Sequence, residues 1–195
     1  MEISVKNDTL DSLLSVLNLE QSQVGNGIKQ IALSDYKYIK DLKINITNAL
    51  LLSNLTEIER YILALATAIN DKKPELIKSL TIKCKELGVS DIEIAEIQSC
   101  VSLLSTNNVF YRFRHFIKKE YYETTPAGIK MSIMMNPVLG KEFFELLSLA
   151  ISALNGCELC VNAHESSLIQ LGTSPARIYD AIKLVSIFRG LTVLI

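Results

Sequence analysis

Two cysteines three positions apart, Cys157 and Cys160, are the residues of this sequence best suited to chemistry. Cysteines at this spacing share one face of a helix, so they can close a small disulfide after one of them is oxidised. Asn155 or Gly156 is expected to cap that helix, which places both cysteines in its first turn. The helix dipole and the free amide groups there stabilise a thiolate and lower the thiol pKa. We therefore predict a redox-active pair.

A histidine and a glutamate complete the predicted site. His164 follows Cys160 by four residues, so on a helix their Cβ atoms lie roughly 5 to 6 Å apart. The histidine can take a proton from Cys160 or hold an imidazolium beside its thiolate. Glu145 lies in the middle of an otherwise apolar helix, where a carboxylate is costly unless it is paired. We expect it to pair with His164, directly or through water, as a proton relay.

The other cysteines and the basic residues are expected to have no part in this chemistry. Cys84 and Cys100 are unpaired at apolar helical positions, which is typical of buried packing residues. His115 is expected to be structural, and the basic cluster of residues 111–119 to be a solvated helix face or to form ion pairs between subunits. The net charge of −1, from 20 basic and 21 acidic residues, offers no field to attract nucleic acid or an anionic membrane.

Composition favours one compact helical domain over residues 1–195. Hydrophobic residues make up 49% of the chain, and there are only 8 Gly and 4 Pro. The mean hydropathy of +0.26 favours buried surface between subunits. The apolar stretches fall short of the roughly 18 to 20 residues that a membrane span needs. The early acidic residues Asp8 and Asp11 do not fit a secretory signal, so we expect a cytoplasmic protein, in which a close cysteine pair is catalytic or metal-binding.

Apolar residues recur every three or four positions through most of the sequence, which predicts an all-α fold. Capping boxes begin at Thr56 and Ser90. Asn136-Pro137 and Ser174-Pro175 are expected to begin helices, and Gly88 and Gly172 to end them. Loops are expected at 21–34 and 124–128. The predicted helices cover residues 8–20, 34–53, 56–71, 75–88, 90–105, 137–154, 157–171 and 174–194.

The chain also contains an internal repeat. Residues 59–70 resemble residues 144–155, with Asn70 on Asn155, and a later block around Gly88 matches one around Gly172 after a length change of one residue. We interpret this as two related helical halves, a degenerate repeat at about 56–105 and an active repeat at about 137–195. The cysteine pair occurs only in the second half, which is expected to contain the active site.

At these residues the chain resembles the AhpD-like alkyl hydroperoxide reductases of the carboxymuconolactone decarboxylase superfamily. Three stretches carry the resemblance: Lys40 to Asn45, Asn107 to His115, and Phe144 to Cys157. The resemblance implies an all-helical bundle of two related halves, assembled as a homo-oligomer, a trimer or a multiple of it. It also implies a thiol-dependent hydroperoxide reductase with a peroxide substrate.

The resemblance further implies roles for the site residues and partners for the chain. Cys160 becomes the sulfenic acid, Cys157 is the proton donor and resolving thiol, and Glu145 and His164 form the relay. Electrons come from dihydrolipoamide on a lipoylated donor protein and can pass to a partner peroxiredoxin. Many members carry a second histidine where this chain has Leu159, which implies a shorter relay and weaker direct peroxidase activity.

Three other readings remain open. The same cysteine pair could serve a disulfide-reductase electron adaptor for a peroxiredoxin. The two cysteines, His164 and Glu145 could be ligands of a zinc ion, or the thiols could be incidental to a structural helical oligomer. The preferred mechanism requires no metal and no bound cofactor, and the sequence contains no Gly-rich nucleotide or phosphate loop.

Overall fold

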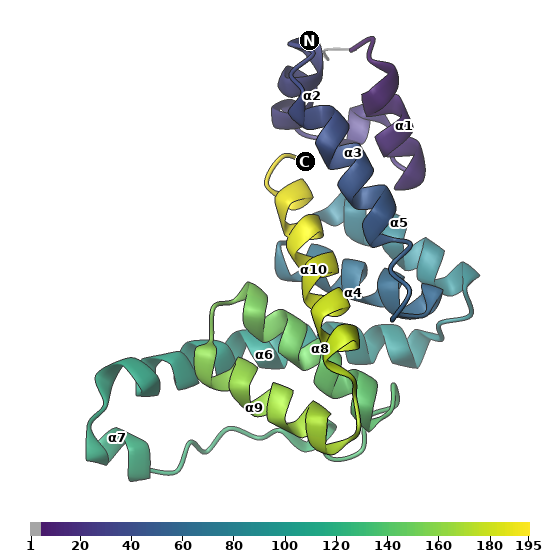
Figure 1. Ribbon diagram of the computed structural model, residues 1–195. Helices are drawn as coiled ribbons and strands as arrows, with labels where there is room; N and C mark the ends of the chain where they lie inside the picture. Colours follow the sequence, from purple (N-terminus) through teal and green to yellow (C-terminus); the bar gives the residue numbers. More distant parts are fainter. Residues whose placement is uncertain (1–4) are drawn as a thin grey trace. The chain divides into compact units, whose positions relative to one another are not determined.

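The computed structural model describes residues 5–195, and every regular element in that range is helical (Figure 1). The predicted all-α class is confirmed. No helix in this part of the chain is long and apolar enough to span a lipid bilayer. The α-helices are α1 (Asp8–Val16), α2 (Asn26–Leu33), α3 (Tyr38–Ala49), α4 (Glu57–Asn70), α5 (Pro74–Glu86), α6 (Asp91–Ile117), α7 (Glu120–Thr124), α8 (Lys141–Leu154), α9 (Glu158–Gln170) and α10 (Pro175–Thr192), with short 3-10 helices at Gln21–Gln23 and Ser132–Met134.

The described chain forms two compact units. One comprises residues 5–89 and 183–195, and the other comprises residues 90–182. Helix α10 begins in the second unit and ends in the first. The predicted single domain over residues 1–195 stays a prediction.

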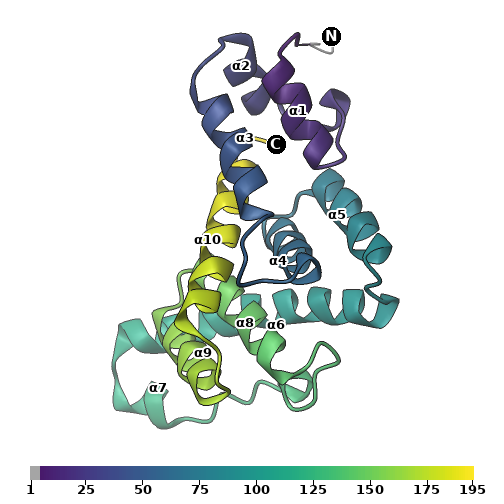
Figure 2. The same cartoon turned by 45° about the vertical axis from the view of Figure 1, so that its right-hand side comes forward.

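In the first unit, α4 and α5 pack against each other as a helical hairpin (Figure 2). Residues 62–68 of α4 are all buried, so this helix forms much of the core of the unit. The connection after α4 is held by Asp71, which accepts a hydrogen bond from Thr192 Oγ1 at 2.5 Å and pairs with Arg189. The last turns of α10 are thereby fixed to the hairpin.

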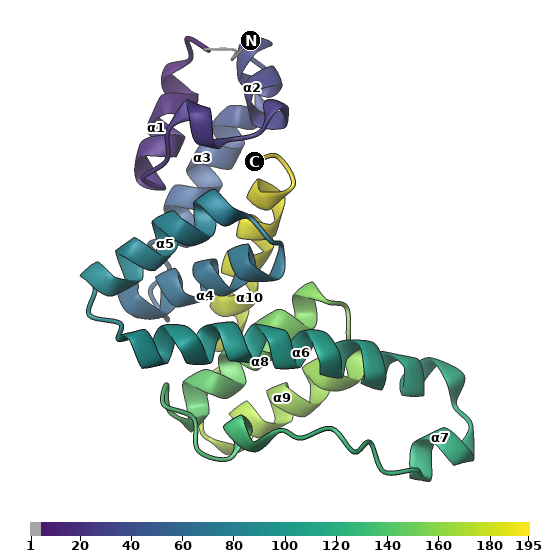
Figure 3. The same ribbon diagram turned by 180° about the vertical axis from the view of Figure 1, so that it is seen from behind.

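In the second unit, α8 packs against both α6 and α9 (Figure 3). Residues 143–152 of α8 are all buried, which makes it the central helix of the unit. Most of these residues are apolar, and their burial drives the packing. Glu145 lies within this buried stretch, so the fold itself removes its carboxylate from water.

Most of the predicted helix signals are confirmed. Thr56 and Ser90 each accept a hydrogen bond from the amide three residues on, and the glutamate there accepts one in return. Ser174 accepts from an amide in the first turn of α10. Gly88 and Gly172 have φ of 93° and 85°, the left-handed conformation that follows a helix end.

The predicted loop at 21–34 is wrong in its second part, which forms α2. Gly25 precedes this helix with an extended backbone, and Ile28 and Ala32 are buried on one face. The Gly25-Asn26-Gly27 motif was a misleading loop signal, because both glycines pack against the backbone at Leu194, where a side chain would be crowded.

Helix α8 begins at Lys141 and not at Pro137. The carboxylate of Glu96 accepts hydrogen bonds from the amides of Val138 and Leu139, both at 2.7 Å, and holds this stretch outside the helix. Gly140 then turns the chain with φ of 81°. A long-range contact therefore overrides the local Asn-Pro signal.

Helix α6 continues to Ile117, twelve residues beyond the predicted end at 105. The apolar pattern is interrupted at Asn107 and Asn108, but both side chains are buried. Asn108 donates to Ser152 Oγ of α8 at 3.0 Å. Polar contacts between helices thus stabilise α6 where hydrophobic periodicity is absent.

Two pairs of consecutive helices have matching lengths. Helices α4 and α8 each contain 14 residues, and α5 and α9 each contain 13. The residue offset between the pairs is 84 at both ends, from 57 to 141 and from 86 to 170. The predicted alignment of Asn70 with Asn155 is therefore one residue off, because Asp71 is the residue that occupies the place of Asn155 after the helix.

Candidate active site

The two cysteines lie where the chain turns from α8 into α9. Asn155 caps the C-terminus of α8, and Gly156 has φ of 68°. Cys157 is the N-cap of α9, and Cys160 is the third residue of that helix. The predicted cap at Asn155 or Gly156 is wrong, because Gly156 completes the turn out of α8. Both cysteines nevertheless lie at the start of α9.

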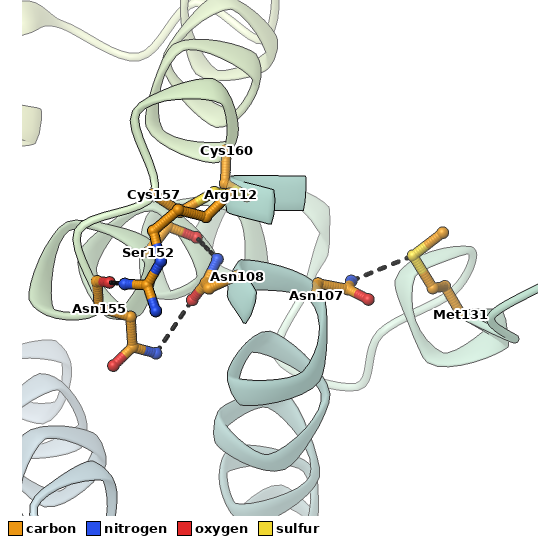
Figure 4. Close-up of a disulfide and its surroundings, with 8 residues drawn as sticks. All are labelled: Asn107, Asn108, Arg112, Met131, Ser152, Asn155, Cys157 and Cys160. Atoms are coloured by element: carbon orange, nitrogen blue, oxygen red, sulfur yellow. Dashed lines mark hydrogen bonds between the residues drawn. A yellow bond between two sulfur atoms is a disulfide. The ribbon is translucent and has the colours of Figure 1, made fainter. Parts of the chain in front are cut away.

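Cys157 and Cys160 are joined by a disulfide, with their Cα atoms 5.3 Å apart (Figure 4). This separation is within the usual range for a disulfide. Cys157 is fully buried, whereas Cys160 is 8% exposed and lines a cavity. Of the two cysteines, Cys160 is therefore the one that borders the cavity.

Glu145 and His164 form a buried pair. The Oε2 atom of Glu145 is 2.7 Å from Nδ1 of His164, and both residues are at least nine-tenths buried. The hydrogen bond with His164 lowers the pKa of Glu145, against the opposing effect of burial. An ionised carboxylate can only accept, so Nδ1 of His164 donates this hydrogen bond, and in a neutral imidazole Nε2 is then the acceptor nitrogen.

His164 also lies near Cys160. It lies one helical turn after Cys160 on α9, and both residues line the same cavity. Residues at this spacing are neighbours on a helix surface. The structure thus brings together all four residues that the sequence predicted, with Glu145 coming from α8 and the others from the start and first turns of α9.

Lys141 is a member of the site that the sequence analysis missed. Its Nζ lies 2.9 Å from Oε1 of Glu145 and donates to the carbonyl of Met134 at 3.0 Å. This ammonium group also lowers the pKa of Glu145. The spacing of four residues between Lys141 and Glu145 on one helix was the available signal.

A hydrogen-bonded chain of polar residues fixes the turn that carries the cysteines (Figure 4). Arg112 donates to the carbonyl of Asn155 at 2.6 Å. The side chain of Asn155 donates to Asn108 at 3.0 Å, and Asn108 donates to Ser152 at 3.0 Å. Arg112 was expected on a solvated face or in contacts between subunits, but it binds within its own unit. Its long-range partner could not be read from local sequence.

The cavity beside Cys160 has a volume of about 280 Å³. It is bounded by α6, α9 and the segment before α8. Its walls are mainly apolar, with the sulfur of Cys160 and the ring of His164 among the few polar groups. The lining residues are Leu104, Asn107, Tyr111, Met131, Met134, Leu159, Cys160, Ala163 and His164.

The remaining cysteines lie outside this site. Cys84 and Cys100 are buried free thiols, as the sequence predicted. Burial raises the pKa of each to about 12, so neither is a thiolate at neutral pH. His115, expected to be structural, lies 3.4 Å from Glu158 at the start of α9.

The zinc reading has no geometric support within residues 5–195. No group of three or more His, Cys, Asp or Glu side chains in that range is arranged to hold a metal ion. Glu145 is engaged by His164 and Lys141, and the two cysteines are bonded to each other.

Known proteins are similar in sequence to this chain over most of its length. An Alkyl hydroperoxide reductase AhpD of Coxiella burnetii is 37% identical over 157 residues, which span 79% of this chain and 88% of the relative. Proteins of the same name from Rhodopseudomonas palustris and Streptomyces coelicolor are 35% and 34% identical over 80% of this chain, and over 86% and 87% of the relatives.

A family model agrees with these relatives. Residues 122–194, which contain the whole α8–α9 turn, match the carboxymuconolactone decarboxylase family. The similarity therefore covers the disulfide, the Glu145–His164 pair and the helices that position them. The chain belongs to the carboxymuconolactone decarboxylase family, among its AhpD-type alkyl hydroperoxide reductases.

Proposed function

We propose that this chain is a hydroperoxide reductase that works through a cycle of dithiol and disulfide at Cys157 and Cys160. The observation that carries the proposal is the accessible Cys160, bonded to a buried Cys157 and one helical turn from a buried His164–Glu145 pair. Relatives with the name alkyl hydroperoxide reductase support the same activity.

The first step oxidises Cys160. The basic Nε2 of His164 takes the thiol proton, and Glu145 stabilises the imidazolium through its hydrogen bond to Nδ1. The thiolate attacks the terminal oxygen of the hydroperoxide, and the O–O bond breaks. The departing alkoxide receives the proton from His164 and leaves as an alcohol, while Cys160 becomes a sulfenic acid.

The second step forms the disulfide. The Cys157 sulfur attacks the sulfenic sulfur of Cys160, and the hydroxyl group leaves as water with the proton of Cys157. The Cα separation of 5.3 Å lets this bond form across the first turn of α9. Because Cys157 is fully buried, we assign it the resolving role, and the accessible Cys160 the peroxidatic role.

The third step restores the dithiol. An external dithiol attacks the disulfide and is itself oxidised to a disulfide, which returns both protons to Cys157 and Cys160. We propose dihydrolipoamide on a lipoylated protein as this donor. An apolar cavity that reaches Cys160 suits a hydrocarbon-rich dithiol. The cycle is complete without a metal, a flavin or a nicotinamide.

A second candidate function is electron transfer from the donor to a partner peroxiredoxin, with little direct peroxide turnover. Leu159 favours this alternative, because it is 44% exposed, lines the cavity beside Cys160 and supplies no proton at a position where the family resemblance implies a second histidine. The disulfide cycle would be the same, but the oxidant would be the disulfide of the partner.

We also propose that the protein is a cytoplasmic homo-oligomer, a trimer or a multiple of one. Large apolar side chains are exposed on the second half of α6 and on α7: Val109 at 61%, Phe116 at 72% and Tyr121 at 71%. Exposed apolar groups at this density are typical of surfaces between subunits. Sedimentation velocity of the full chain tests this assembly.

The test of function is consumption of an organic hydroperoxide with dihydrolipoamide as the sole reductant. We expect the parent to turn over and Cys160→Ser and Cys157→Ser to be inactive. Cys84→Ser is a matched control, since that thiol is buried and distant in sequence from the site. A parent that fails to consume hydroperoxide, but whose disulfide is readily reduced by dihydrolipoamide, contradicts direct peroxidase activity and favours the electron adaptor.

A further inference from the structure

The two carboxylate oxygens of Glu145 have different partners. Oε2 accepts the hydrogen bond from Nδ1 of His164 at 2.7 Å, and Oε1 lies 2.9 Å from Nζ of Lys141. Glu145 is 5% exposed, so water does little to offset its charge. A neutral imidazole has no charge to offer. When His164 is neutral, Lys141 is therefore the cation paired with this buried carboxylate.

Lys141 reaches Glu145 from the surface of its unit. It is the first residue of α8, one helical turn before Glu145, and its side chain is half-exposed. Its Nζ also donates to the carbonyl of Met134, a residue that lines the cavity beside Cys160. Two of its three N–H groups therefore have acceptors in the protein. These contacts fix the ammonium group between the carboxylate and the segment before α8.

The first hairpin has no equivalent of this ion pair. With the offset of 84 residues, Lys141 and Glu145 of α8 correspond to Glu57 and Tyr61 of α4. A glutamate and a tyrosine do not form an ion pair with each other. The packing of the hairpin therefore does not require the pair, which occurs only in the half of the repeat that carries the two cysteines.

The number of protons on the Glu145–His164 pair decides whether His164 can act as a base. With one proton, on Nδ1, the Nε2 atom can accept another from a thiol. A second proton leaves Nε2 protonated, whether the imidazole takes it up or the carboxyl takes it up and donates to Nδ1. The hydrogen bond with His164 lowers the pKa of Glu145 most, and Lys141 lowers it further, against the effect of burial. The ammonium group therefore opposes uptake of the second proton.

The helices packed against α8, which are α6 and α9, bring no second cation to Glu145 within residues 5–195 (Figure 3). On α6, Cys100 is a buried thiol whose pKa burial raises to about 12. Glu96, on the same helix, accepts hydrogen bonds from two amides before α8. On α9, the titratable neighbours are His164 and Cys160. One lysine therefore supplies the positive charge at this carboxylate.

We propose that Lys141 is a positioning residue, whose ammonium group holds Glu145 as the ionised acceptor of the Nδ1–H of His164. The Nε2 atom then stays free to take the proton from the sulfur of Cys160, while the proton on Nδ1 does not move. Lys141 itself neither gives nor takes a proton. The inference rests on the proposed function, because it concerns the step that forms the Cys160 thiolate.

The experiment measures oxidation of the reduced full chain by cumene hydroperoxide from about pH 5.5 to about pH 8.5. The chain has no tryptophan, so samples are quenched and the remaining thiols are alkylated and counted. Lys141→Met removes the charge and keeps a long side chain. We expect the acid limb of its profile to move to higher pH by about one unit, which lowers the rate constant about tenfold on that limb. Near pH 8.5 the two proteins should agree within about twofold, because an ordinary thiol ionises there without a base.

Three further variants separate charge from shape. Lys141→Arg keeps a cation and should recover most of the shift. Lys141→Gln keeps a donor without the charge and should behave as Lys141→Met does, which it replaces if the latter does not fold. Lys130→Met removes the same charge from an exposed lysine that is not an ion-pair partner of Glu145, and should match the parent. A parent-like Lys141→Gln, or a loss in Lys141→Met that is equal at every pH, overturns the inference.

Alkylation by iodoacetamide tests the inference apart from peroxide turnover. In a Cys157→Ser background, Cys160 is the remaining thiol of the pair, and its alkylation also requires the thiolate. Mass spectrometry of the modified peptide gives the rate at each pH. We expect Lys141→Met to move this profile to higher pH as well. If the parent does not consume hydroperoxide but the alkylation profile moves, the proposed function fails and the role of Lys141 stands. Superimposable alkylation profiles show that Lys141 has no such role.

Discussion

The turn between α4 and α5 and the turn between α8 and α9 have the same backbone but different contents. In both, the three connecting amides bond back to the preceding helix in the same order, from residues 71–73 and from residues 155–157. The middle residue is left-handed in each, with φ of 57° at Lys72 and 68° at Gly156. The two turns therefore have the same backbone conformation, although only the second carries the cysteines.

The difference lies in the side chains at equivalent places. With the offset of 84 residues, Leu76 and Leu80 of α5 correspond to Cys160 and His164 of α9. Both leucines are 1% exposed core residues. Cys160 and His164 thus occupy positions that serve packing in the other hairpin, and they are correspondingly buried.

The charged partners of the two turns also differ. Asp71 pairs with Arg189 and Thr192, which fixes α10, whereas the equivalent Asn155 is bound through its carbonyl by Arg112. The first turn is held to the last turns of α10, and the second to the C-terminal part of α6. Each turn needs an outside anchor because a three-residue connection has few contacts of its own.

The largest effect should come from changing Cys160 of α9 and the equivalent Leu76 of α5. We expect Cys160→Ser to lower hydroperoxide turnover at least about 1,000-fold, because the nucleophile is lost. With both proteins reduced, so that no disulfide contributes, the unfolding free energy should change little. Leu76→Ala, the matched change in α5, should lower the unfolding free energy by about 2 to 5 kcal/mol and leave the redox chemistry of the folded protein intact. Turnover assays and urea unfolding measure both; a stable, active Cys160→Ser would refute the assignment.

A second variant replaces His164 with leucine, the residue type at the equivalent position of α5. We expect His164→Leu to slow oxidation of Cys160 by about 100-fold, the lower range for removing a general base. Leucine fits this place in α5, so a large loss of stability is not expected from shape, although Glu145 loses its hydrogen bond. The rate constant for thiol oxidation should be measured at several pH values for the parent and for His164→Leu. An unchanged rate would show that His164 only packs.

The pH dependence of stability should reveal the Glu145 pair. Its pKa is lowered in the folded state by His164, so the pair stabilises the fold above the unfolded pKa of about 4.3. This contribution is lost as pH falls through the lower folded value. Glu145→Gln, which cannot ionise, should therefore be less stable than the parent at pH 6 and approach it in acid. Urea unfolding from pH 6 to pH 3 measures the difference, and parallel curves would contradict it.

The smallest effects concern the left-handed residues of the two turns. Gly156→Ala should cost about 1 kcal/mol of unfolding free energy, because φ is 68° there. Its Cβ would meet only Arg112 at 3.9 Å, an ordinary contact. Lys72→Gly should stabilise by up to about 1 kcal/mol, because it relieves the same conformation. Thermal unfolding of both variants tests whether their changes in stability have opposite signs. If both midpoints shift in the same direction, the two turns are not equivalent.

Local signals in the sequence were sufficient for much of the fold. The capping boxes at Thr56 and Ser90 and the helix ends at Gly88 and Gly172 were predicted, because each depends on residues within one turn. The same holds for the spacing of Cys157, Cys160 and His164 on α9. The pairing of Glu145 with His164 followed from the cost of a lone carboxylate in an apolar helix.

Only the tertiary structure decided the parts that depend on distant segments. The predicted helix ended at residue 105, but α6 continues through Asn107 and Asn108 because α8 and the segment before it supply acceptors for the Nδ2 atoms of both side chains. Helix α8 begins at Lys141, after the predicted start at 137, because Glu96 accepts hydrogen bonds from the preceding amides. Arg112 is likewise an anchor through a contact 43 residues away in sequence. Hydrogen bonds of this kind override local preference because a buried polar group without a partner costs free energy, and the partner can come from any part of the chain.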